Sequence, residues 1–116
     1  MLKLKKHNIK DFLEFSEERF TKRVVFKEDK TTVFILNFKA GQSLPAHKHP
    51  KSNVQILVLQ GEGTFTVDGE EVVAMQEDTL FLTGDEELAF SNTGPENVSL
   101  YVMLNRIPDD RYAENL

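Results

Sequence analysis

The sequence of 116 residues predicts a single all-β domain, built as a sandwich or a closed barrel. Beyond about residue 20, apolar and polar residues alternate with a period of two, which is the period of a strand with one buried face. The chain divides into about eight or nine such segments, and turn-forming residues separate them every 8–12 positions. A chain of this length buries about two-thirds of its unfolded surface, so one core is expected.

Composition excludes several classes of protein. The chain has no cysteine, which excludes a disulfide framework, thiolate metal sites and cysteine nucleophiles. Its net charge of −5 and its pI of about 5.2 argue against a nucleic-acid partner. No apolar run is long enough to span a membrane, and the basic N-terminus lacks the apolar stretch of a signal peptide. We therefore expect a soluble, cytoplasmic protein with no membrane partner.

Residues 1–20 are expected to form an N-terminal helical arm. Apolar residues at mixed spacings of three and four between Asn8 and about Phe20 predict one short helix. Asn8 is the expected N-cap, and Asp11 then lies beside the positive end of the helix dipole. Five phenylalanines fall within the first 34 residues, which indicates that this arm packs onto the body of the protein.

Residues 21–105 are expected to form the barrel, and residues 106–116 an exposed C-terminal tail. Glu28–Lys30 reads as a hairpin turn, and Asp68-Gly69 suits the positive φ angles of a type I′ hairpin. Closing the sheet would remove exposed edges. The predicted strands are Thr21–Phe26, Thr32–Phe38, Leu44–His49, Val54–Gln60, Thr64–Val67, Glu71–Met75, Thr79–Leu82, Leu88–Asn92 and Val98–Leu104.

One segment carries residues suited to chemistry, Gly41–Gly61, with the sequence GQSLPAHKHPKSNVQILVLQG. His47 and His49 stand at positions i and i+2, so in an extended chain both side chains leave the same face, with Cα atoms about 6.6 Å apart. Two imidazoles so placed could bind one metal ion at about 2.0–2.1 Å from each nitrogen. The same face could equally hold two neutral histidines that are hydrogen-bonded to the backbone or solvated at a rim.

The spacing of this segment resembles the first conserved motif of the cupin superfamily. Gly41 is followed after five residues by the H-x-H pair, and Gly61 stands twelve residues beyond His49. The sequence GEGTFTVDGEE continues the resemblance, and EDTLFLTGDEELAFSN is similar to the second cupin motif. The resemblance covers roughly Phe34–Leu104. It implies a cupin-type double-stranded β-helix, a jelly-roll barrel that here follows a short N-terminal helix.

Two positions depart from the family pattern. In the family the metal is typically held by three histidines and one glutamate. By the motif spacing, Val54 stands at the glutamate position and Leu88 at the position of the third histidine. The resemblance implies a divalent metal such as iron, nickel, zinc or manganese, and the loss of two ligands predicts that it is weakly held.

The candidate metal ligands are therefore His47, His49 and, as a reserve, Gln55. Strand alternation places Gln55 on the face opposite Val54, so it needs a β-bulge after Asn53 to reach inward. We expect both imidazoles to point into one cavity that Val54 and Leu88 help to line.

Three functions follow from this interpretation. The first is a small barrel that binds an apolar or weakly polar small molecule, with His47 and His49 as polar anchors. The alternative is a metal-dependent enzyme, since the resemblance implies dioxygenases or isomerases. The third is a structural role with a collapsed cavity. The missing ligand pair favours the binding protein, and we expect no robust turnover by this chain alone.

The sequence also predicts a homodimer. Both faces are apolar in Thr32–Phe38 and in Val54–Gln60, whereas a small barrel has only one interior. The arm, through Phe12, Phe15 and Phe20, could cover part of the second face on its own subunit or on a partner. The resemblance points the same way, because small single-domain cupins commonly pair. The alternative is that the arm covers the whole face within one chain.

Overall fold

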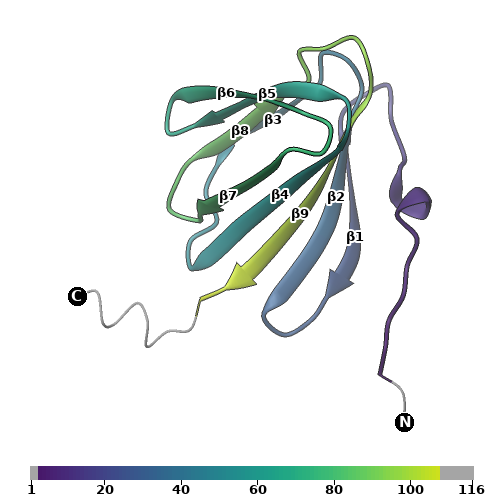
Figure 1. The fold of residues 1–116 in the computed structure, drawn as a ribbon, viewed down its shortest axis with the longest axis vertical. Helices are drawn as coiled ribbons and strands as arrows, with labels where there is room; N and C mark the ends of the chain where they lie inside the picture. The colour runs from purple at the N-terminus through teal and green to yellow at the C-terminus, as the bar shows by residue number, and fades with distance from the viewer. Residues whose placement is uncertain (1–2, 108–116) are drawn as a thin grey trace.

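The strands of the protein form two antiparallel sheets that face each other, in a computed structural model that describes residues 3–107 (Figure 1). The larger sheet has the order β1-β2-β9-β4-β7, with β1 at Thr21–Lys27, β2 at Thr31–Phe38, β9 at Val98–Arg106, β4 at Ser52–Gln60 and β7 at Thr79–Thr83. The smaller sheet has the order β3-β8-β5-β6, with β3 at Ser43–His47, β8 at Leu88–Ser91, β5 at Glu62–Val67 and β6 at Glu70–Met75. The predicted all-β barrel is confirmed.

The turns follow the residues that favour them. Asp68 and Gly69 have φ angles of 49° and 83°, as the type I′ hairpin between β5 and β6 requires. The predicted strand Leu44–His49 ends early, since β3 stops at His47. Beyond it, Lys51 has a φ of 67°, and the chain turns sharply into β4. His49 therefore lies in a turn beside the barrel wall.

The predicted N-terminal helix is wrong in extent, because only a single 3₁₀ turn forms, η1 at Ile9–Phe12. The expected cap is present: the side-chain oxygen of Asn8 accepts from the backbone N–H of Lys10 at 2.9 Å. Beyond this turn the arm runs without regular secondary structure to β1. An isolated short helix is only marginally stable in water, so packing against the sheet decides the conformation.

The packing of the arm explains why the helix does not continue beyond Phe12. Side chains of the barrel donate hydrogen bonds to backbone carbonyls of the arm, and these carbonyls would otherwise serve a continuing helix. The side chain of Phe12 is buried against the outer face of the larger sheet. The acceptors are the carbonyls of Phe12, Glu14 and Ser16, and their donors are the side chains of Asn37, Thr21 and Gln42 respectively.

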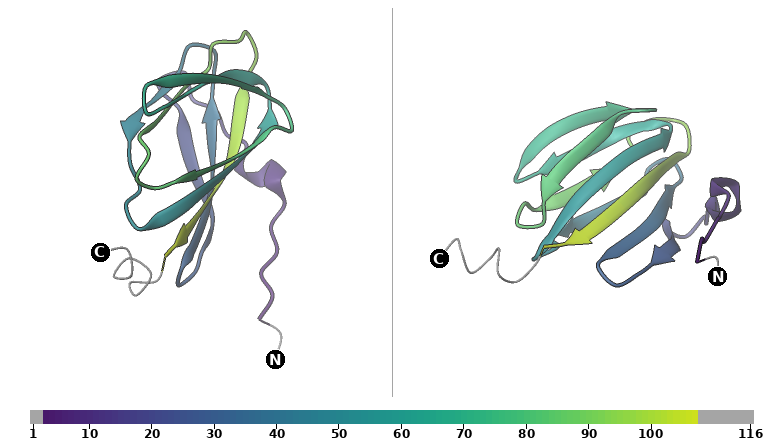
Figure 2. Two further views of the ribbon diagram at one scale, coloured as in Figure 1. Left: turned by 60° about the vertical axis from the view of Figure 1, so that its left-hand side comes forward. Right: turned by 60° about the horizontal axis from the view of Figure 1, so that its bottom comes forward.

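Two apolar clusters lie on opposite faces of the larger sheet. The first fills the space between the sheets. At its centre the ring centroid of Phe90 lies 4.9 Å from that of Phe38 and 4.7 Å from that of Phe65. The second lies on the outer face, where Phe12 of the arm covers Val33 and Ile35. Figure 2 shows the arm beside the five-stranded layer. The two apolar faces of β2 are thus both covered within one chain.

The described residues end just after β9. Arg106 closes this strand, and the N–H of Ile107 donates to the carbonyl of Lys51 at 2.8 Å. The rest of the expected tail, residues 108–116, lies outside the described residues. No helix within residues 3–107 is long and apolar enough to cross a membrane.

Candidate functional site

A cavity of about 220 Å³ lies between the two sheets, close to the end of β3 and the start of β4. Aromatic and aliphatic side chains form most of its wall, among them Phe20, Phe34, Phe65, Val54, Leu88 and Leu100. Its polar side chains come from Lys22, His47 and His49. The cavity thus combines an apolar wall with a few polar groups gathered at one end, the usual composition of a small-molecule site.

The structure brings His47, His49, Val54 and Leu88 together around this cavity. His47 ends β3 and pairs with Leu88 of β8, which fixes its side chain on the inner face. The N–H of His49 donates to the carbonyl of Gly84 at 2.9 Å, so the loop between β7 and β8 holds the turn that carries it. The two imidazole rings meet edge to face, with centroids 4.7 Å apart and planes at 86°.

Hydrogen bonding fixes the tautomer of one imidazole. Nδ1 of His47 lies 2.8 Å from the carbonyl oxygen of Pro45, and since a carbonyl can only accept, Nδ1 is the donor. In the neutral ring, Nε2 of His47 then carries a lone pair. The side chain of His49 makes no hydrogen bond within residues 3–107, so either of its nitrogens can carry the proton.

Burial lowers the pKa of His49 below its ordinary value of 6.5. The adjacent imidazole of His47 lowers this pKa further, and the ammonium group of Lys22 does so to a smaller extent. Desolvation penalises the imidazolium form, and a positive charge on either neighbour repels it. His49 is therefore held in its neutral form more readily than an ordinary solvated histidine.

Lys22 is the site residue that the sequence did not reveal. It pairs with Leu36 of β2, whose side chain lies in the interior, so Lys22 is on the inner face of the edge strand β1. Its ammonium nitrogen lies 4.4 Å from the centroid of the Phe34 ring, a cation–π geometry. The alternation of Thr21–Lys27 placed Lys22 on one face of a strand, but a lysine ordinarily marks the solvent face.

The reserve ligand, Gln55, does not reach the cavity. The β4–β9 ladder is regular from Ser52 to Val58, and its irregularity falls between Val58 and Gln60, not after Asn53. Alternation therefore leaves Val54 buried on the inner face and Gln55 exposed on the outer face. The expectation that Gln55 turns inward is corrected by this regular register.

The groups present do not fit a metal ion held by four protein ligands. Within residues 3–107 no three side chains of His, Cys, Asp or Glu gather into one cluster. Val54 and Leu88, at 1% and 3% exposure, put hydrocarbon at the two positions where the motif spacing expects ligands. The ammonium group of Lys22 adds a positive charge beside the two imidazoles. This donor set offers two neutral nitrogens and no anion to offset a divalent charge.

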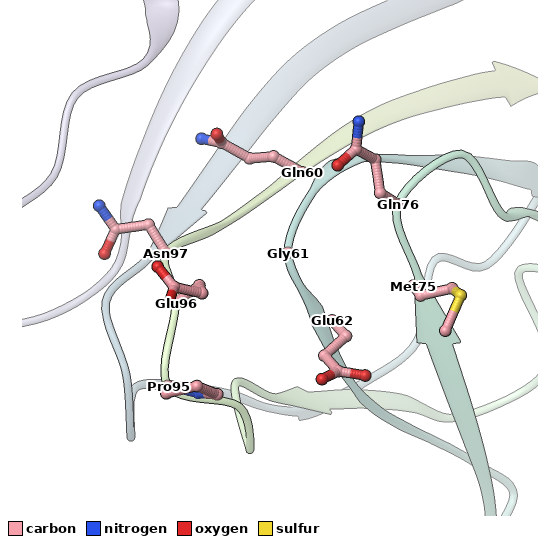
Figure 3. A pocket seen from close by; sticks show the side chains of 8 residues that line it. All are labelled: Gln60, Gly61, Glu62, Met75, Gln76, Pro95, Glu96 and Asn97. Carbon is pink, nitrogen blue, oxygen red and sulfur yellow. The ribbon is translucent and has the colours of Figure 1, made fainter.

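A larger hollow, of about 700 Å³, lies at the opposite end of β4 around Gly61 (Figure 3). Its wall consists of strand ends and the turns beside them, including Gln60, Gln76 and Glu96, and the polar groups labelled in Figure 3 do not point to a common centre. A binding site needs convergent polar groups within an enclosing wall. The smaller cavity beside His47 and His49 meets that requirement, and it is the candidate site.

Comparison with solved structures gives the same fold. The protein TT1209 from Thermus thermophilus superposes with a TM-score of 0.83 and 20% identity over 90% of this chain and 100% of that chain. An RmlC-like cupin protein from Desulfovibrio desulfuricans has a TM-score of 0.74 and 28% identity over 85% and 95% of the two chains. The Cnp3 cupin domain of Schizosaccharomyces pombe has a TM-score of 0.81 and 16% identity over 96% and 80%.

Sequence comparison identifies the family. No curated protein sequence matches the chain. The family model described as Cupin domain matches residues 34–104, which is more than half of the 116 residues and the same region that the motifs occupy. With the two-sheet barrel and its structural neighbours, this match shows that the chain belongs to the cupin family.

Proposed function

We propose that this protein binds a small, largely apolar molecule in the cavity between its sheets. The observation that carries the proposal is the cavity itself, since protein interiors are otherwise packed with few voids larger than a water molecule. An engineered apolar cavity of about 150 Å³ in another protein binds benzene. A volume of about 220 Å³ suits a molecule somewhat larger than benzene.

Each part of the wall has a role in this proposal. Phe20 and Leu44, which are partly exposed, offer apolar surface, and burying the ligand against it contributes about 25 cal/mol per Å² removed from water. Nε2 of His47 can accept a hydrogen bond from the ligand, because its Nδ1 already donates to Pro45. His49 supplies a second polar group whose proton position adjusts to the ligand.

The donor set argues for binding rather than metal-dependent catalysis. A metal-dependent dioxygenase or isomerase needs an ion that activates water or polarises an oxygen atom. Here Val54 and Leu88 supply hydrocarbon where such an ion would need ligands. We therefore propose that His47 and His49 act as anchors for a ligand.

Binding of benzene and xenon to the purified protein tests this proposal, because both probes are neutral and enter apolar cavities. We expect NMR shifts of the methyl groups of Val54 and Leu88 on addition of either probe. Leu44→Trp fills the cavity from β3, where Leu44 is partly buried, and should abolish these shifts. Val73→Trp is the matched control, because Val73 is 70% exposed on β6. Folded protein that binds neither probe would refute the proposal.

A further inference from the structure

Among the described residues, Lys22 presents a positive charge at the cavity and forms no ion pair with a carboxylate. The ion pairs within residues 3–107 join Lys5 to Glu28, Arg23 to Glu14, and Lys39 to Glu17, and Lys22 takes part in none of them. Its strand neighbour Arg23 stands on the outer face and pairs at 2.7 Å.

The cavity wall around Lys22 consists of cationic or neutral side chains among the described residues. Within residues 3–107, the side chains that line the cavity include no aspartate or glutamate. Lys22 and His49 line the same cavity, and the ring of His49 is free to donate an N–H, since its side chain has no hydrogen bond in this part of the chain. The mouth of the cavity therefore gathers hydrogen-bond donors in a protein whose net charge is −5.

We propose that the ligand of this cavity is a small organic carboxylate, with its carboxylate held by the ammonium group of Lys22 and a ring N–H of His49, and its apolar body in the cavity. This inference rests on the proposed function and names the class of molecule that the cavity takes. The positive charge of Lys22 at the mouth of the cavity is what favours a carboxylate over a neutral or cationic ligand. The same ammonium group that repels a divalent cation attracts an anion.

Geometry supports a division of the ligand into two parts. Lys22 is exposed overall and Phe34, beneath its ammonium group, is buried, so the charge stands at the rim and the apolar wall lies deeper. A carboxylate at the rim keeps part of its hydration, which avoids most of the cost of burying an anion. A ligand without an apolar body, such as acetate, would leave the deeper part of the cavity without contacts.

Three probes of nearly identical shape test the charge preference: benzoate, benzamide and benzamidine, which are anionic, neutral and cationic at pH 7.5. Isothermal titration calorimetry should give the tightest binding for benzoate, with benzamide weaker by about tenfold, since a hydrogen bond to a charged group contributes more than a neutral one. Benzamidine should bind least tightly. Acetate should bind more weakly than benzoate because it lacks the apolar body.

Variants of Lys22 then test its role. Lys22→Met keeps the aliphatic stem and should weaken benzoate binding by about tenfold without changing benzamide binding, and Lys22→Arg should preserve the preference. Lys48→Met is the matched control, because Lys48 lies between the two histidines in sequence and is not part of the cavity wall. In the wild-type protein, 1 M salt should weaken benzoate binding selectively.

The outcomes separate this inference from the proposed function. Equal affinity for benzoate and benzamide, or benzoate binding unchanged in Lys22→Met, would overturn the carboxylate assignment and leave the cavity as a neutral site. Benzene binding without benzoate binding would do the same. Failure of benzene, xenon and all the charged probes would overturn the proposed function itself.

Discussion

His49 and Gly84 are joined backbone to backbone: the N–H of His49 donates to the carbonyl of Gly84 at 2.9 Å. The N–H of Gly84 donates in turn to the carbonyl of Ser52 at 2.7 Å. A Cβ atom on Gly84 would overlap the carbonyl oxygen of His49. Only glycine therefore fits where the loop after β7 passes the backbone of His49. The loop that follows β7 thus positions a histidine of the cavity mouth.

Gly84→Ala should therefore displace the turn that carries His49. We expect the free energy of unfolding to fall by about 1–3 kcal/mol, since the added atom overpacks rigid backbone. Benzoate affinity should fall with it. Chemical denaturation and NMR signals of the His49 ring measure the two effects. Gly94→Ala is the control, because its Cβ would approach its nearest atoms no closer than 3.3 Å. Equal effects in the two variants would contradict a special role for Gly84.

Wild-type protein should retain less than one equivalent of divalent metal after dialysis, because two imidazoles beside Lys22 make a weak site. The double variant Val54→Glu, Leu88→His supplies the two missing ligands and should bind zinc or manganese. At a metal concentration of 100 times Kd, bound metal should stabilise the variant by about 2.7 kcal/mol. Elemental analysis and thermal unfolding provide the measurements.

The control for this double variant is Val54→Gln, Leu88→Met, which changes the size of both side chains without adding a strong ligand. One equivalent of metal retained by the wild type and lost in His47→Ala would contradict the prediction. That result would favour the alternative of a metal-dependent enzyme.

Acidification should destabilise the protein partly through His49. Its folded-state pKa is lowered, so near pH 6.5 the unfolded chain binds more protons than the folded chain does. Its contribution to the free energy of unfolding is complete above about pH 6.5 and is lost as the pH falls through the folded-state pKa. Urea denaturation between pH 7.5 and 5.5 should show a shallower pH dependence in His49→Gln. A slope in His49→Gln equal to that of the wild type would contradict this prediction.

We propose that two copies pair through the outer face of the larger sheet. The arm covers the part of this face formed by β1 and β2, whereas Leu57 on β4 stays 38% exposed beside a groove of about 220 Å³ that Ile9 and Tyr101 also line. Leu57→Lys should convert the dimer to a monomer, and Val73→Lys, on the other sheet, should not. Sedimentation measures the mass, and a wild-type mass near 13.3 kDa would refute the dimer.

The strands were predictable because their alternation is local. Asp68-Gly69 needs only neighbouring residues to be interpreted, and its turn lies where the sequence predicts it. The extent of the N-terminal helix was not predictable in this way. Its apolar spacing serves to cover Val33 and Ile35, a demand made by residues distant in sequence.

Part of the cavity wall was also predictable, because local sequence patterns determine it. Val54 and Leu88 follow from motif spacing and strand alternation, and both lie at the wall. The inward position of Lys22 depends on the register of β1 against β2. No local sequence pattern reveals that register. The prediction that Gln55 turns inward was wrong because the irregularity of β4 falls near the end of the strand, beyond Val58.

The position of Lys22 on β1 places the mouth of the cavity at one edge of the larger sheet. β1 pairs only with β2 within that sheet, so fraying of this strand carries the ammonium group away from the opening. If the proposed carboxylate binds there, we expect its escape and the local opening of β1 to be one event. Its residence time should then follow the opening rate of the strand, and its binding should slow amide exchange along Thr21–Lys27.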